Sequence, residues 1–169
     1  MWLWLALVGC VKPTLVSGPD GPYDVEAREP QTFMYVDYRW GLGPFDDATA
    51  LEEAVARLAA ERGELIEAVA RFPTLRDWQL GAIVRTPLEV SEIGGRPVHV
   101  ELLPAGRYAR LHTVGHVDTL FRRWGLLERM VAADGEAVEG PVMEVYPDLL
   151  TGTSHEEMRG EVRYRLATR

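Results

Sequence analysis

Residues 140–147 read Gly-Pro-Val-Met-Glu-Val-Tyr-Pro, a pattern that predicts a strand. Successive side chains of a strand point to opposite faces, so Val142, Glu144 and Tyr146 are predicted to share one face. Glycine and proline at the ends of the stretch are typical of strand boundaries. We therefore expect a strand that carries a carboxylate and a phenol about 7 Å apart on the same face.

The elements around this strand form the second half of the chain. A strand is predicted over 107–114, where polar and apolar residues alternate. A helix follows, with Asp118 as its cap, and its apolar stripe includes Trp124, which is expected to pack in the core. Strands over 141–147 and 160–166 close this half.

The first half shows the same order of elements. A strand over 31–40 is rich in aromatic and β-branched residues, a helix follows it, and strands over 78–85 and 96–103 end this half. The chain is thus predicted as an α+β fold, in which a strand–helix–strand–strand unit is duplicated over about 31–103 and 104–168. Two such units side by side would share an antiparallel sheet with the helices packed on one face, and the seam between them is a natural cleft.

The helix of the first half is predicted from its start signal and its stripe. Thr49-Ala50-Leu51-Glu52 is a capping box, which is typical of a helix N-terminus. The acidic residues nearby are then explained as charges at the helix start: Asp46, Asp47, Glu52 and Glu53. The helix is expected to continue, with a break or bend at Gly63, along an apolar stripe of Leu51, Val55, Leu58, Leu65, Ile66 and Val69.

Composition and charge restrict the classes of function. The chain has 169 residues, a mass of 18.9 kDa and a formal net charge of −8. A nucleic-acid partner is not expected, because phosphate binding needs a basic surface. The single cysteine excludes an intramolecular disulfide and a multi-cysteine zinc site. No metal site is predicted, because His112 and His116 lie on a strand and its turn rather than at helical ligand spacing.

The N-terminus carries a separate signal. Nine apolar residues, MWLWLALVG, precede Cys10, and a transmembrane helix needs about 20. Leu7-Val8-Gly9-Cys10 has the pattern of a bacterial lipobox, and a Pro/Gly/Ser-rich tether follows up to Pro22. Residues 1–22 are thus predicted as signal and tether, and 23–169 as the folded domain of a membrane-anchored lipoprotein of the cell envelope, lipidated at its cysteine. A chance apolar start in a cytoplasmic protein is the alternative.

Several stretches resemble the GyrI-like family, also called the AraC-type effector-binding domain. They are LPAGRYA at 103–109, VGH at 114–116, and the stretch at 140–147, which is similar to the P-x-x-E-V-Y strand of the family. Residues 161–164 are similar to its closing strand, although Arg165 stands where a proline is usual.

The resemblance covers roughly residues 24–168 and implies a duplicated α+β unit. Such domains bind small hydrophobic or cationic molecules, multiple drugs among them, between their repeats. Family members occur fused to DNA-binding domains, as free binding proteins, and as hydrolases of cyclopropane-bearing compounds. The resemblance also implies that an acidic residue at the place of Glu144 lines the ligand pocket.

Two carboxylates are the main candidates for chemistry. Glu144, with Tyr146 beside it in an apolar cleft, suits a cationic ligand and also acid–base work, since burial disfavours the charged carboxylate. The alternative is an exposed strand face. Glu161 is the second candidate, with an ion pair to Arg163 on an outer face as its alternative. Strand pairing decides whether the two carboxylates meet, and the sequence does not fix the register.

Aromatic residues are the candidates for the walls of a ligand pocket. Tyr35, Tyr38 and Trp40 come from the first repeat, and Tyr108 comes from the second. Plain core packing is the alternative for each of them.

Three functions remain open at this point. The first is non-enzymatic binding of a small hydrophobic or cationic molecule, with no cofactor. The second is a hydrolase of a small electrophilic, cyclopropane-type compound, with Glu144 as general base and Tyr146 as an orienting donor. The third is haem binding, because haem-binding SOUL proteins share this general fold.

Overall fold

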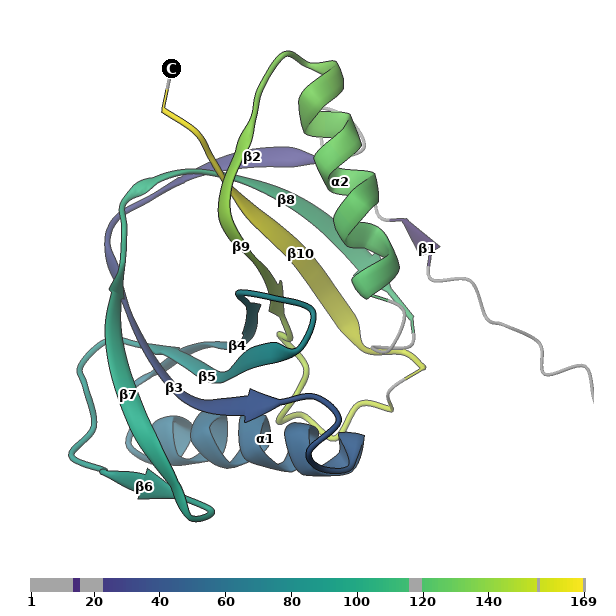
Figure 1. The fold of residues 1–169 in the computed structure, drawn as a ribbon. Helices are drawn as coiled ribbons and strands as arrows, with labels where there is room; N and C mark the ends of the chain where they lie inside the picture. The colour runs from purple at the N-terminus through teal and green to yellow at the C-terminus, as the bar shows by residue number, and fades with distance from the viewer. Residues whose placement is uncertain (1–13, 16–22, 116–119, 155, 169) are drawn as a thin grey trace, which may run out of the picture.

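A curved antiparallel sheet and two helices make up the described part of the chain (Figure 1). The structure is a computed structural model, and it describes residues 14–15, 23–115, 120–154 and 156–168. The helices are α1 (Phe45–Glu61) and α2 (Phe121–Ala133). The strands are β1 (Thr14–Leu15), β2 (Asp24–Arg28), β3 (Gln31–Arg39), β4 (Leu65–Phe72), β5 (Asp77–Val84), β6 (Glu92–Ile93), β7 (Arg96–Leu103), β8 (Gly106–Val114), β9 (Val138–Val145) and β10 (Arg159–Leu166).

The strand order confirms that a strand–helix–strand–strand unit is duplicated, but the strands of the first unit differ from the prediction. This unit contains β4, whereas the strand predicted to end it, over 96–103, is β7 and lies outside the unit. The strand order runs β1-β8-β10-β9-β4-β5-β3-β7-β6, and β2 also pairs with β8. The units β3-α1-β4-β5 and β8-α2-β9-β10 meet where β4 pairs with β9. In each unit the first strand lies beside the last, since β3 pairs with β5 and β8 pairs with β10. The strand before each unit pairs with the opposite unit. Strand β2, before the first unit, pairs with β8 of the second, and β7, before the second unit, pairs with β3 of the first.

The predicted course of the first helix is wrong at both ends. Helix α1 begins at Phe45, with Pro44 as its N-cap, so the capping box at Thr49 lies inside it. It ends before Gly63, whose φ of 70° is a left-handed conformation that glycine adopts without strain. The apolar residues after this glycine form β4 instead of a longer helix. Their helical spacing was a coincidence, and pairing with β5 and β9 on both sides stabilises them as a central strand.

Both helices cover the same face of the sheet, as predicted. Helix α1 contacts β3, β4 and β5, and α2 contacts β8, β9 and β10. The main apolar cluster lies between the helices and this face and includes Val142 and Tyr146. A smaller cluster on the opposite face includes Met143 and Val145. The alternation predicted from residues 140–147 is therefore confirmed.

Some predictions fall on residues that the structure does not describe. They include the lipobox at Cys10, most of the tether, and the helix cap at Asp118. Within the described residues, helix α2 begins at Phe121, and Leu120 precedes it as N-cap. No helix in the described ranges is long and apolar enough to cross a membrane.

Candidate functional site

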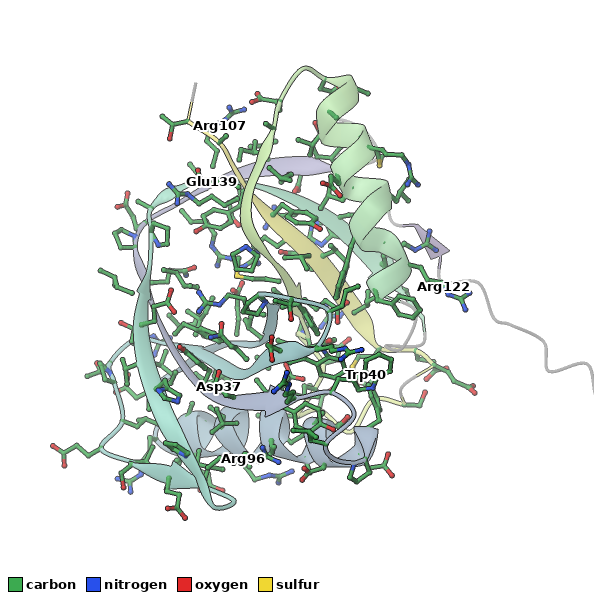
Figure 2. The ribbon with its side chains drawn as sticks, viewed as in Figure 1. Asp37, Trp40, Arg96, Arg107, Arg122 and Glu139 are labelled. Carbon is green, nitrogen blue, oxygen red and sulfur yellow. The ribbon has the colours of Figure 1, made fainter. Side chains whose placement is uncertain are left out.

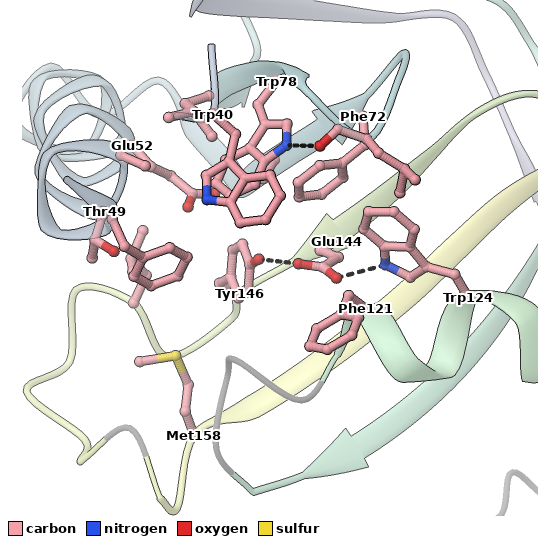
Figure 3. Close-up of a pocket in the computed structure, with 16 residues that line it drawn as sticks. Trp40, Thr49, Glu52, Phe72, Trp78, Phe121, Trp124, Glu144, Tyr146 and Met158 are labelled. Atoms are coloured by element: carbon pink, nitrogen blue, oxygen red, sulfur yellow. Dashed lines mark hydrogen bonds between the residues drawn. The ribbon is translucent and has the colours of Figure 1, made fainter. Parts of the chain in front are cut away.

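A cavity of about 560 Å³ lies between α1 and α2, over the centre of the sheet (Figure 3). Both halves of the chain contribute to its wall, and most of the lining side chains are aromatic or aliphatic. The lining residues are Trp40, Phe45, Ala48, Thr49, Glu52, Ala70, Phe72, Leu75, Trp78, Leu80, Phe121, Trp124, Glu144, Tyr146, Leu149 and Met158.

Glu144 is held at the cavity by hydrogen bonds to two aromatic neighbours. It lies near the end of β9 and is 4% exposed. The indole Nε1–H of Trp124 donates to its Oε1 at 2.6 Å, and the Tyr146 hydroxyl donates to its Oε2 (Figure 3). Donors on both oxygens stabilise a negative charge and fix the plane of the carboxylate. The face predicted for Glu144 is therefore a cavity wall rather than a solvent-exposed surface.

A second carboxylate, Glu52 of α1, lines the same cavity. It is 6% exposed, and its Oε1 has no hydrogen-bond partner among the described residues. Burial raises the pKa of Glu52 well above its usual value, and the charges of Glu144 and Glu53 raise it further. The prediction that Glu52 is a charge at the helix start is wrong, because α1 starts seven residues earlier and this position is buried within it.

Aromatic rings form the remaining walls. Trp78 packs edge-on against Phe72 at 5.4 Å between ring centroids and stacks with Trp40 at 6.3 Å. Phe72 also contacts the ring of Trp124 at 4.7 Å. These rings are arranged in a continuous series from the exposed end of β3 to the hydrogen bond at Glu144. The cavity thus offers several π-faces around one carboxylate of fixed orientation.

The structure brings three of the predicted site residues to this cavity: Glu144, Tyr146 and Trp40. Tyr38 lies behind the wall. Its ring packs against Trp78 at 5.5 Å, and its hydroxyl donates to the carbonyl oxygens of Gly43 and Pro44, which holds the turn before α1.

Tyr35 and Tyr108 lie on the opposite face of the sheet. Both belong to the smaller apolar cluster or pack against it. Tyr35 stacks with Phe33 and His99, at 5.0 and 5.3 Å between ring centroids. The Tyr108 hydroxyl donates to the carbonyl oxygen of Pro104 at 2.8 Å. Neither residue is among those that line the cavity.

Glu161 is also separated from Glu144 by the sheet. The β9–β10 register pairs Val162 with Glu144 and places Glu161 opposite Val145, so the two carboxylates point to different faces. Arg163 Nε donates to Glu161 Oε1 at 2.6 Å, and Arg163 also donates to Glu67 of β4. The ion pair with Arg163, considered above as the alternative for Glu161, is present. It is buried between strands instead of lying on an outer surface.

Two further cavity residues were assigned other roles on the sequence. Trp124 packs against the core as predicted, but it also lines the cavity and donates to Glu144. The sequence did contain a signal that Glu52 is buried. Its neighbours at helical spacing are all small or apolar, and all are buried: Ala48, Val55, Ala56 and Ala59. A lone acidic residue within a buried helical stripe needs a partner or a function.

Histidine is not among the described cavity residues. His99 and His112 lie near Asp37 and Glu161 respectively, within 3.4 Å of a carboxylate oxygen, and His116 and His155 are outside the described residues. The described lining therefore offers haem no axial imidazole ligand.

Solved structures share this fold at low sequence identity. A chain of the EcmrR–DNA complex has 13% identity and a TM-score of 0.67, and the match covers 87% of this chain and 57% of that one. The crystallised EcmrR C-terminal domain has 12% identity and a TM-score of 0.64, with 87% and 98% of the two chains covered. The protein thus spans a little more than half of the longer EcmrR chain and nearly all of its C-terminal domain.

Two other solved structures match over a similar share of this chain. SAV2435, solved bound to tetraphenylphosphonium, has 13% identity and a TM-score of 0.57 over 86% of this chain and 93% of that one. A hydrolase from Listeria innocua has 11% identity and a TM-score of 0.57 over 86% and 91%. No protein-family model matches the sequence, and no curated protein does. The chain is therefore similar in fold to EcmrR C-terminal and SAV2435 structures, which is consistent with the GyrI-like resemblance of its sequence.

Proposed function

We propose that the protein binds a hydrophobic organic cation in the cavity between α1 and α2, with Glu144 as the counter-charge. One observation carries the proposal: a buried carboxylate, oriented by Trp124 and Tyr146, faces an aromatic cavity. The cavity volume of about 560 Å³ is within the range that encloses drug-sized molecules.

Charge favours a cation over an anion or a neutral ligand. The described lining includes two carboxylates, Glu52 and Glu144, and neither lysine nor arginine. A buried carboxylate oxygen without a hydrogen bond, such as the Oε1 of Glu52, is costly, and a bound cation would stabilise a negative charge there. An anion would place a negative charge beside these carboxylates in a site of low dielectric constant.

The aromatic walls favour a hydrophobic cation with its charge spread over a large apolar surface. Trp40, Trp78 and Trp124 all line the cavity, and tryptophan offers the strongest cation–π attraction of the aromatic side chains. A small, strongly hydrated cation would lose its water without filling the space. Tetraphenylphosphonium, which is bound to the similar fold of SAV2435, is thus a suitable probe.

Isothermal titration calorimetry with two ions of matched shape tests the proposal. We expect saturable binding of tetraphenylphosphonium and none of tetraphenylborate, which has the same four phenyl groups and the opposite charge. Glu144→Gln should weaken phosphonium binding by roughly 30-fold or more, because it removes the buried counter-charge. Glu61→Gln, a change of the same type at an exposed position of α1, serves as control. Equal binding of both ions, or unchanged affinity in Glu144→Gln, would refute the proposal.

Hydrolysis is the second candidate, because Tyr146 donates to a carboxylate that is enclosed in the same cavity. In that role Glu144 would activate a water molecule, and Tyr146 would orient the Glu144 carboxylate through its hydrogen bond. Both oxygens of Glu144 already accept hydrogen bonds, which makes it a weaker base and favours binding. Turnover of a cyclopropane-bearing electrophile that stops in Glu144→Gln, with the fold intact, would support hydrolysis instead.

We also propose that Cys10 carries a lipid anchor, so that the domain works at the surface of a membrane in the cell envelope. The support is the sequence, in which nine apolar residues and a lipobox-like pattern precede a Pro/Gly-rich tether. Mass spectrometry of the protein from its natural source tests this directly. An acylated Cys10 at the N-terminus is expected, and an intact Met1 would contradict the anchor.

A further inference from the structure

We infer that the mouth of the cavity is a membrane-contact surface, so that the site opens toward the lipid and takes its ligand from there. The surface, called the rim below, consists of Trp40, Leu42, Phe45, Leu75 and Phe121. The inference rests on the proposed function and on the lipid anchor, and it adds the orientation of the site.

The rim gathers large apolar side chains that the fold leaves exposed. Its five residues are among nine exposed large apolar residues in the described part of the chain. Four of them line the cavity, and Leu42, 79% exposed, lies in the turn between Trp40 and Phe45. Exposed apolar side chains that gather around one cavity are typical of a site that contacts another apolar phase. A tryptophan at its edge suits the boundary between lipid and water.

The start of the described chain lies close to this rim. Thr14 of β1 pairs with Val114 of β8, and Val114 pairs with Arg159 of β10. Two strand spacings separate Thr14 from Arg159, which is about 10 Å, and Met158 next to it lines the cavity. In the single view that Figures 1 and 2 share, β1, Trp40 and Arg122 all lie toward the right of the molecule.

The length of the connection limits how far this side can be from a membrane. Four residue steps join Cys10 to Thr14 in the sequence, and an extended chain covers about 3.5 Å per step. Thr14 would therefore lie within about 14 Å of an anchored Cys10. A domain held so closely by β1 has its cavity mouth near the lipid, where the rim can insert.

The charges around the rim are mixed. Arg122 lies over the ring of Phe121, with 5.6 Å between its Cζ and the ring centroid, and the exposed Arg39 pairs with Asp77 at 3.6 Å. Asp46 is also exposed at the start of α1. Burial of apolar side chains, rather than net charge, is therefore expected to drive the contact, with Arg122 able to reach lipid phosphates.

Hydrogen exchange of the full chain on phosphatidylcholine vesicles tests the inference, with two matched variants. We expect vesicles to slow amide exchange in residues 40–46 and 74–77 but not in the exposed edge of β7. Leu42→Ser should weaken vesicle binding roughly tenfold or more. Leu102→Ser, the same change at a residue of β7 that is 65% exposed, should leave it unchanged.

Three results with vesicles would overturn the inference. They are an absence of vesicle binding, vesicle binding without protection of the rim, and equal binding by the two variants. Protection of the rim that grows with protein concentration in the absence of vesicles would also overturn it, since a second copy would then cover the surface. Leu42 does not line the cavity, so tetraphenylphosphonium titration in lipid-free buffer tests the proposed function separately.

Discussion

At the scale of single residues, the two cavity carboxylates differ in how their charge is supported. Glu144 accepts hydrogen bonds from Trp124 and Tyr146, whereas the Oε1 of Glu52 has no partner among the described residues. The protein thus keeps at least one polar atom buried at a cost in stability. Such a cost is typical of groups that a ligand satisfies.

Glu52 is expected to lower the stability of the folded protein at neutral pH. Its pKa is raised in the folded protein, so the folded state holds this proton at pH values where the unfolded chain has lost it. The contribution of Glu52 to stability is therefore full below its ordinary pKa and is lost as pH rises through the folded value. Glu52→Gln should be more stable than wild type, and the difference should grow with pH from acid to neutral. Denaturant unfolding at several pH values measures it, and a constant difference would contradict it.

Ligand affinity should depend on pH for the same reason. A bound cation favours the ionised form of Glu52, so binding releases a proton wherever the free protein keeps Glu52 neutral. Tetraphenylphosphonium should bind more tightly as pH rises from 5 toward neutrality and above. The slope should be smaller in Glu52→Gln. Calorimetric titrations in buffers of different ionisation enthalpy would detect the released proton, and an equal slope in both proteins would assign it to another group.

At the scale of elements, alternation along strands was predictable and helix limits were not. The faces of residues 140–147 were predicted correctly because successive side chains of a strand alternate between two faces. A shift of one residue would move every side chain to the other face. The end of α1 was missed because apolar residues of β4 continue the helical spacing by chance. Gly63 was the local signal of the break, and its left-handed conformation makes the end physically necessary.

Strand β5 depends on a glycine at its close contact with β3. A Cβ on Gly81 would overlap the main-chain carbonyl oxygen of Met34 and the Cα of Tyr35. Gly81→Ala is therefore expected to destabilise the protein by about 2–3 kcal/mol or more, because main-chain atoms have to move. Gly125→Ala on α2 is the matched control. Its Cβ would meet only Arg129 Nη1 at 3.4 Å, and alanine is the better helix former by about 0.5–1 kcal/mol. Denaturant midpoints that are equal for the two variants would contradict this account.

At the scale of the whole molecule, the cavity exists because two units meet. Its lining comes from α1 and β5 of one unit and from α2 and β9 of the other, and β4 pairs with β9 below it. The sequence predicted two units and a cleft, but not which side chains would face it. Separation of Glu161 from Glu144 depends on a register between β9 and β10 that no local pattern encodes.

A ligand that contacts both units should stabilise the whole domain. At a concentration of 100 times its Kd, tetraphenylphosphonium should add about 2.7 kcal/mol to the free energy of unfolding. For a domain of this size, that corresponds to a rise in Tm of roughly 5–10 °C. Differential scanning calorimetry measures the rise, with tetraphenylborate as the control of matched shape. Two separate transitions, of which only one responds to the ligand, would contradict a shared site.

The most direct measurement is the anomalous diffraction of a crystal grown with tetraphenylarsonium, whose arsenic marks the centre of the cation. We expect one arsenic peak inside the cavity between α1 and α2, with the Glu144 carboxylate as the nearest charged group, and no such peak in Glu144→Gln. An arsenic peak on the outer surface, or the same occupancy of the cavity in both proteins, would contradict this expectation.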